Sequence, residues 1–365
     1  DGWVRSLLVV GGYCPGGLGR DISPLRSERR ESFAALLPPF ERGDLRRARN
    51  IQVNLPGRAR NHGQAQILQQ GSRRGQRVGL VCNPASVMPD TFVHAADVFE
   101  ARDEFTLTTL FGPQHGIRGD VQYNMIEPPH VRDPRTGIMV YSLYSEVREP
   151  TEEMVRDIDT FVVDLQDVGC RIYTFVYTMA NCMRAAKKFG KKVVVCDRPN
   201  PIGGIGVEGN ITEHEFKSFV GQFELPTRHG MTSGELAKTF NEHFGIGCDL
   251  EVVEMDNWSR EMWGDETGLP WILPSPNIPT VDTCVLFPAT VYVEGTELSD
   301  GRGMTRPFHL KGPPSTDTLA GVSDHDEICF AVAKLWAAFS RPSRCDVAGN
   351  PCDVVPCLAH VVKIF

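Results

Sequence analysis

The chain has 365 residues, of which 41% are hydrophobic and 23% charged, and its formal net charge is −8. This composition is typical of a globular protein with one large domain or two smaller ones. The acidic balance and the lack of a basic stripe argue against a nucleic-acid partner. No apolar run approaches the roughly 18 residues of a membrane helix. The run Leu7–Gly12 is too short for a secretory signal, so the sequence leaves localisation open.

The first 75 residues are rich in arginine, glycine and proline, with little periodicity beyond a possible short helix near Ser32–Leu37. Residues 1–75 are therefore expected to be a poorly specified N-terminal extension. Regular alternation begins at Arg77. It predicts strands at 78–82, 105–111, 138–142, 160–165 and 192–196, and helices at 92–101, from 150 onward, and at 174–189 with Gly190 as the cap. This alternation predicts an α/β fold: a Rossmann-like parallel sheet flanked by helices, over residues 76–230.

A second, smaller α+β domain is expected to start within residues 231–312. Thr232-Ser-Gly-Glu235 has the form of a capping box and predicts a helix that ends near Gly245. Strands are expected at 249–255 and 286–293, with a loop system between them at 258–279. Residues 313–365, with a possible helix at 328–339, form an atypical tail. The family resemblance described below implies that this second domain is truncated, and a truncated or mis-translated reading frame would explain both unusual ends.

The cysteines and histidines do not form a metal-binding pattern. The eleven cysteines include no Cys-x-x-Cys pair, and neither His115 nor His229 has a ligand partner within four residues. Cysteines in apolar segments are expected to be small buried side chains; they are Cys82, Cys170, Cys182, Cys196 and Cys284. No metal is expected.

Three predicted strands end in polar residues. Phe111-Gly-Pro-Gln-His-Gly-Ile-Arg-Gly119 follows the second strand, Asp164 and Asp167 end the 160–165 strand, and Asp197-Arg198-Pro-Asn200 ends the next. Ligands of open α/β sheets bind at this carboxyl edge, so the three ends together predict a site. Each aspartate could instead organise a turn.

One motif suggests a nucleotide site and is rejected. Gly204-Ile-Gly206-Val-Glu-Gly209 has the glycine spacing of a dinucleotide-binding loop. Such a loop must follow a strand directly and open a helix. Here Pro199-Asn-Pro-Ile-Gly203 intervenes and no helical pattern follows, so a nucleotide cofactor is not expected.

A series of longer motifs resembles a known family. FGPQHGIRGD, VYSLY, DLQDVGCRIYTFVYTM, DRPNPIGG, VEGN, SFVGQFELPTRHGMTSGELA, GLPWILPSPNIP and EGTELSDGRGMTRPF follow one another between about residues 77 and 312. Together they resemble the exo-β-N-acetylmuramidases, which are bacterial peptidoglycan hydrolases. The resemblance implies a Rossmann-like domain, a smaller C-terminal domain and an active site in the cleft between them. The implied activity is removal of N-acetylmuramic acid from the non-reducing end of peptidoglycan fragments, as in cell wall recycling. Members of the family are often exported, whereas recycling enzymes work inside the cytoplasm.

The resemblance and the strand ends together suggest a set of site residues. Glycosidic cleavage usually needs an acid and a second group for water or the anomeric carbon, and the lactyl carboxylate of the sugar needs a cation or N–H donors. The catalytic candidates are Asp164, Asp167, Asp197, Glu294 and His115. The substrate-binding candidates are Gln114, Arg118, Arg171, Arg198, Asn200, His229, Arg302 and Arg306.

This chain departs from the family at Gln114. The family motif commonly has Gly-Pro-Glu-His-Gly, and its glutamate is the leading catalytic candidate. Glutamine cannot transfer a proton as an acid or base. The sequence therefore keeps a second hypothesis, a non-catalytic protein that binds muropeptides or amino sugars. It also leaves open the oligomeric state and whether cleavage would retain or invert the anomeric configuration, which depends on the carboxylate separation.

Overall fold

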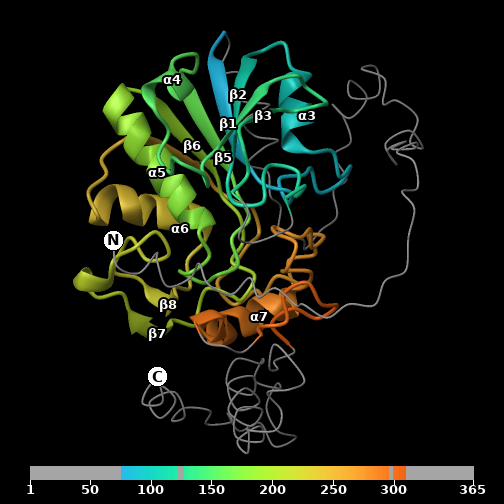
Figure 1. The fold of residues 1–365 in the computed structure, drawn as a ribbon, viewed down its shortest axis with the longest axis vertical. Helices are drawn as coiled ribbons and strands as arrows, with labels where there is room; N and C mark the ends of the chain where they lie inside the picture. The colour runs from blue at the N-terminus through green and yellow to red at the C-terminus, as the bar shows by residue number, and fades with distance from the viewer. Residues whose placement is uncertain (1–74, 122–126, 296–298, 310–365) are drawn as a thin grey trace, which may run out of the picture. The chain divides into compact units, whose positions relative to one another are not determined.

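A computed structural model describes residues 75–121, 127–295 and 299–309 of the chain. Its core is a seven-stranded sheet in the order β3-β4-β2-β1-β5-β6-β9 (Figure 1). All neighbouring strands are parallel except the pair β3–β4. The strands are β1 Arg77–Cys82, β2 Thr106–Gly112, β3 Val131–Arg132, β4 Met139–Ser142, β5 Thr160–Asp164, β6 Lys192–Cys196 and β9 Asp249–Val253. The predicted α/β fold with a mostly parallel sheet is confirmed.

Each face of the sheet has its own hydrophobic core. Alternate residues of a strand point to opposite faces, and Phe161 and Val163 of β5 join one core whereas Val162 joins the other. The first core lies under α4, α5 and α6, and the second lies under α3. These helices are α3 Ala95–Glu100, α4 Glu152–Val155, α5 Phe175–Phe189 and α6 Ser233–Lys238. Because both faces are covered, the central strands are apolar on both sides.

Helix α5 begins and ends where the sequence predicts, and α6 begins at the predicted capping box but ends earlier, at Lys238. Gly190 follows α5 with a φ of 64° and donates its N–H to the Ala186 carbonyl, a left-handed cap that glycine adopts without steric cost. Thr232 and Glu235 form the complete capping box of α6. A π-helix, Thr239–His243, continues α6 towards Gly245.

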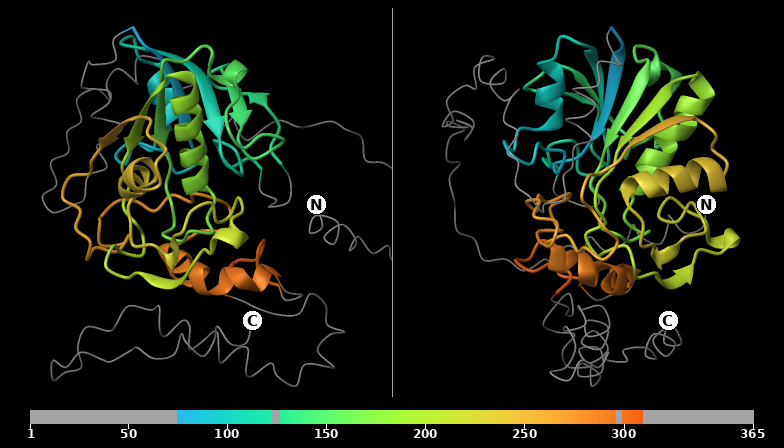
Figure 2. Two further views of the ribbon diagram at one scale, coloured as in Figure 1. Left: turned by 90° about the vertical axis from the view of Figure 1, so that its left-hand side faces the viewer. Right: turned by 180° about the vertical axis from the view of Figure 1, so that it is seen from behind.

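Strand β1 lies between β2 and β5, so the chain changes direction across the sheet at this point. The carboxyl ends of the parallel strands meet at one edge (Figure 2). Beyond that edge lie the antiparallel pair β7 Glu208–Ile211 and β8 Pro226–Arg228, and helix α7 Val281–Thr290. The loops after the strands therefore face these later segments, which places polar residues from both in one region.

The segment expected as a strand at 286–293 is helical. Helix α7 covers residues 281–290 and a 3-10 helix follows at Val291–Gly295. The Thr280 hydroxyl accepts the Thr283 N–H at the start of α7, and Asp282 lies in its first turn. Cys284, Phe287 and Val291 are buried in the first core. Their helical spacing outweighs the β propensity of the valines and aromatics.

The structure also tests several smaller expectations from the sequence. The five cysteines expected to be buried are buried. No helix opens at Gly204–Gly209, and the strand β7 begins there instead. Strand β9 belongs to the sheet, which therefore extends past residue 230. The N-terminal extension with its short helix, and the tail with the helix at 328–339, lie outside the described residues. Within the described ranges, no helix is long and apolar enough to span a bilayer.

Candidate active site

A cavity of about 100 Å³ opens beside the end of β2, and we call it the Gln114 cavity. Its walls come from the loops after β2, β4 and β5, from the 275–278 segment, and from α7 and the residues that follow. It is lined by Gln114, His115, Tyr144, Ile172, Tyr173, Thr174, Val220, Ser275, Asn277, Ile278, Phe287, Val291, Glu294, Arg302 and Phe308. Four of the expected site residues therefore meet here, although about 180 positions separate the two pairs: Gln114 and His115, and Glu294 and Arg302.

A tight turn after β2 delivers Gln114 and His115 to the cavity. The Gly116 N–H donates to the Pro113 carbonyl at 3.1 Å, and His115 has a φ of 72°, which a residue with a side chain rarely adopts. The His115 Nδ1 lies 2.8 Å from the Val121 carbonyl. Because a carbonyl only accepts, Nδ1 carries the proton and Nε2 is left as an acceptor. Burial lowers the pKa of His115, which favours this neutral form.

The charged groups of the cavity centre on Arg302. Its Nη2 donates to Glu294 at 2.7 Å and its Nε donates to Asp300 at 2.7 Å. Its guanidinium also lies over the Phe308 ring, 5.0 Å from the centroid. Nη1 has no partner among the described residues. Glu294 is the one carboxylate lining this cavity in the described part of the chain.

Aromatic and amide side chains complete the walls, and the sequence had not singled them out. Burial raises the pKa of Tyr173 well above its usual value, so its hydroxyl stays protonated. Asn277 accepts the Gly303 N–H at 3.0 Å and ties the 275–278 segment to the Arg302 loop. Tyr144, Tyr173, Ser275 and Asn277 all lie inside the family-like motifs, in loops after strands or helices. That position was the available signal for them.

Asp164 and Arg198 do not lie in the Gln114 cavity. They form a buried bidentate pair, with Nε to Oδ1 at 2.6 Å and Nη2 to Oδ2 at 3.0 Å. The Asp164 side chain is 1% exposed and that of Arg198 is 8% exposed. The pair links the ends of β5 and β6, and this pairing suits a structural role for Asp164.

Asp197 is engaged at the start of α6. Its Oδ1 accepts the Gly234 N–H at 2.6 Å and the Arg198 N–H at 2.9 Å, and its Oδ2 accepts the Thr232 hydroxyl at 3.1 Å. Burial raises its pKa to about 6 even though these bonds favour the ionised form. Its contacts hold α6 against β6, and it does not line the Gln114 cavity.

Asp167 pairs with His229 in the interior. Oδ2 of Asp167 accepts the Gly169 N–H at 2.7 Å and lies 3.2 Å from Nε2 of His229. Nδ1 of His229 accepts the Met231 N–H, so Nε2 carries the proton and donates to Asp167. Oδ1 of Asp167 is buried with no partner among the described residues. The His229 side chain is 0% exposed, so it does not reach a substrate directly.

The remaining expected residues serve local structure or lie on the surface. Arg118 bridges Asp97 and Asp133 at 2.7 Å each. Arg171 donates to the carbonyls of Asn210 and Leu225 and so supports the β7–β8 pair. The Asn200 side chain bonds the backbone of Met231 and Ile202. Arg306 is exposed and does not line the Gln114 cavity.

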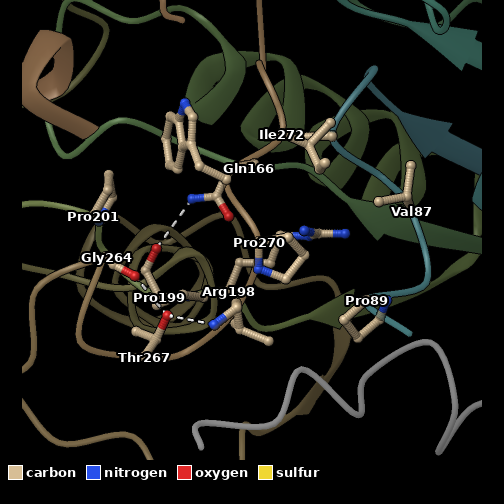
Figure 3. A pocket seen from close by; sticks show the side chains of 13 residues that line it. Val87, Pro89, Gln166, Arg198, Pro199, Pro201, Gly264, Thr267, Pro270 and Ile272 are labelled. Carbon is tan, nitrogen blue, oxygen red and sulfur yellow. Dashed lines mark hydrogen bonds between the residues drawn. The ribbon is translucent and has the colours of Figure 1, made fainter. Parts of the chain in front are cut away.

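A second cavity, of about 40 Å³, lies at the ends of β1, β5 and β6, and we call it the Gln166 cavity (Figure 3). It is lined by Ala85, Val87, Pro89, Gln166, Arg198, Pro199, Pro201, Gly264, Thr267, Leu269, Pro270, Trp271 and Ile272. Of the expected site residues it holds Arg198 alone. The Gln114 cavity is therefore the better candidate active site, because it brings together four of them with an exposed carboxylate and an unsatisfied guanidinium nitrogen.

Comparison with known proteins identifies the same family that the sequence motifs resemble. Residues 78–282 match the family model described as exo-β-N-acetylmuramidase NamZ, N-terminal, and residues 285–355 match its C-terminal counterpart. The chain is 48% identical over 241 residues to the peptidoglycan β-N-acetylmuramidase NamZ of Bacillus subtilis (strain 168), covering 66% of this chain and 58% of that protein. The chain thus spans less than two thirds of the length of this relative.

Two solved structures also match the fold of this chain. A DUF1343 family protein of Bacteroides fragilis NCTC 9343 superimposes with a TM-score of 0.62 at 41% identity, covering 68% of this chain and 64% of its own. A second protein of that family from the same organism gives 0.59 at 32% identity, covering 69% and 66%. The N-terminal family model alone covers more than half of the chain, and the chain belongs to the exo-β-N-acetylmuramidase NamZ family.

Proposed function

We propose that this protein is a glycoside hydrolase that removes N-acetylmuramic acid from the non-reducing end of peptidoglycan fragments, with the sugar in the Gln114 cavity. The observation that carries the proposal is the meeting of Gln114, His115, Glu294 and Arg302 in one cavity of a NamZ family chain. The relative from Bacillus subtilis is named a peptidoglycan β-N-acetylmuramidase.

The cavity offers separate groups for binding and for chemistry. Nη1 of Arg302 is placed to hold the lactyl carboxylate of the sugar, since a guanidinium binds carboxylates with directed N–H groups. Glu294 beside it supplies the carboxylate for a base or nucleophile role. Gln114 is placed to bond a hydroxyl or the N-acetyl group. It supplies no proton to the leaving oxygen, so hydrolysis by this chain is expected to be slow.

The test is the change Gln114→Glu, assayed with the β-1,4-linked disaccharide of N-acetylmuramic acid and N-acetylglucosamine, because its sugar leaving group must take up a proton to depart. A restored general acid is expected to raise kcat by about 10²- to 10⁴-fold. Gln222→Glu is the matched control, because it adds the same charge beside Arg184, at a residue that does not line the cavity. Its activity should equal that of the unchanged protein.

The outcomes separate two functions. Hydrolysis that rises only in Gln114→Glu supports the glycosidase. N-acetylmuramic acid binding without hydrolysis in both proteins favours the second candidate, a non-catalytic binding protein, which Gln114 itself suggests. Failure of both proteins to bind or cleave the sugar overturns the proposal.

A further inference from the structure

The Gln166 cavity lies where open α/β sheets usually bind ligands. Its walls include Val87 after β1 and Gln166 after β5, and the sheet order reverses between these two strands. None of the roles proposed above uses this cavity. The segment 264–272 forms one of its walls, and the 275–278 segment a few residues later lines the Gln114 cavity.

Gln166 presents a fixed acceptor. Its Nε2 donates to the carbonyls of Asp167 at 2.8 Å and Pro199 at 3.1 Å. Because carbonyls only accept, these two bonds settle which end of the amide is nitrogen, and Oε1 is left without a partner among the described residues. The residue is 7% exposed and lines the cavity. Oε1 therefore remains available in the cavity to accept from a ligand or water.

Arg198 presents donors beside it. Its Nε and Nη2 are bound to Asp164, and Nη1 has no partner in the part of the chain that the structure describes. The residue is 7% exposed and lines the same cavity, where Figure 3 shows it with Gln166 among the surrounding prolines. Asp164 already neutralises the guanidinium. The cavity therefore favours a neutral group over an anion, because an anion would pay its desolvation cost without a free counter-charge.

The volume and the lining of the Gln166 cavity limit which ligand group it can hold. A volume of about 40 Å³ holds about three or four water-sized groups, at roughly 10–15 Å³ for each. The other walls are mainly apolar and include Pro89, Pro199, Pro270 and Ile272. A small neutral group with one donor, one acceptor and a methyl fits this lining.

We propose that the Gln166 cavity binds the acetamido group of an N-acetylated amino sugar, as a second site apart from the Gln114 cavity. The amide N–H donates to Oε1 of Gln166, the amide carbonyl accepts from Nη1 of Arg198, and the methyl packs on the prolines. The choice of an amide depends only on these two side chains. The choice of a sugar as its carrier rests on the proposed function.

The test measures N-acetylglucosamine binding to the full chain by titration calorimetry. Every protein in the series carries Val220→Trp, which fills the Gln114 cavity from an exposed position. Gln166→Leu is unsuitable as the main variant, since it breaks two buried contacts to the backbone. Ile272→Trp fills the Gln166 cavity instead, and the control is Leu273→Trp, whose side chain is exposed and does not line it.

N-acetylglucosamine is expected to bind with a millimolar Kd, and Ile272→Trp should weaken it by about tenfold or more, a change of roughly 1.4 kcal/mol. Leu273→Trp should leave the Kd unchanged. Glucosamine, which lacks the acetyl group, should not bind. Equal binding of glucosamine, or unchanged binding in Ile272→Trp, overturns the proposal. Stronger binding of N-acetylalanine methylamide than of the sugar overturns the sugar assignment. None of these readouts needs hydrolysis, so failure here is distinct from failure of the proposed function.

Discussion

Two groups of polar residues at the carboxyl edge of the sheet differ in what they leave unsatisfied. At the ends of β5 and β6, Asp164 and Asp197 are both bonded within the protein. Around the Gln114 cavity, Glu294 and Arg302 bond each other while facing open space. Both groups have the residue types of an active site. The difference separates Asp164 and Asp197, whose carboxylates the protein itself binds, from Glu294, which lines a cavity.

The first prediction tests whether the β5–β6 group is structural. Asp164→Ala leaves the Arg198 charge buried without its partner, and we expect a loss of about 3–5 kcal/mol in the free energy of unfolding. Asp157→Ala is the control, because its carboxylate is 63% exposed and 3.8 Å from Arg77. It should cost at most about 1 kcal/mol. Urea denaturation measures both, and equal losses would contradict the distinction.

The second prediction concerns pH, through Asp197. Burial raises its folded pKa to about 6, above the 3.8 of an exposed aspartate. The folded state therefore binds more protons between these values, and its stability contribution is present below pH 4 and falls as the pH rises to 6. Asp197→Asn should remove this loss, which amounts to about 3 kcal/mol for two pKa units. Asparagine keeps an oxygen for the two backbone donors to Oδ1.

The readout for Asp197 is the difference in unfolding free energy between the two proteins at pH 4, 5, 6 and 7. Taking the difference cancels the contributions of the other titrating groups, such as Asp133. Burial would raise the pKa of Asp133, but hydrogen bonds from Arg118 and Thr136 favour its ionised form and lower the pKa to about 2. We expect the relative stability of Asp197→Asn to rise from pH 4 to 6 and then level off. Parallel curves for the two proteins would rule out a titrating Asp197.

The third prediction concerns the turn at Gly169, whose N–H donates to Asp167. Gly169 has a φ of 83°, and a Cβ there would clash with Oδ1 of Asn200 and lie 2.5 Å from Cγ1 of Ile202. Gly169→Ala should cost about 1–3 kcal/mol, because a residue with a side chain is strained at that φ. Gly137→Ala is the control: its φ is 73°, but no atom lies within 4 Å of a Cβ there. A larger loss at Gly169, measured by thermal unfolding, indicates that packing adds to the strain.

These expectations separate what sequence patterns can and cannot predict. Strands β1, β5 and β6 were predicted because buried parallel strands are runs of apolar residues. The Asp164–Arg198 pair joins residues 34 positions apart, and it depends on β5 lying next to β6, which no local pattern encodes. The β7–β8 pair escaped prediction because β7 is largely exposed without alternation and β8 has only three residues. The long motifs pointed to Gln114, Glu294 and Arg302, whereas a strand end alone could not rank them above Asp164.

The smallest expected stability effect gives the sharpest contrast between the two groups. Glu294→Gln keeps the shape of a side chain that is 47% exposed and removes one ion pair with Arg302. The free energy of unfolding should change by less than about 1 kcal/mol. Hydrolysis by the Gln114→Glu protein should nevertheless be lost when Glu294→Gln is added, because the change removes the carboxylate proposed as base or nucleophile. Retained kcat in the double variant would assign the catalytic role to another group. The next candidate is Asp167, a buried carboxylate whose Oδ1 has no partner among the described residues. A stable but inactive double variant would show that the Gln114 cavity, unlike the β5–β6 group, gives its charge to the substrate and not to the fold.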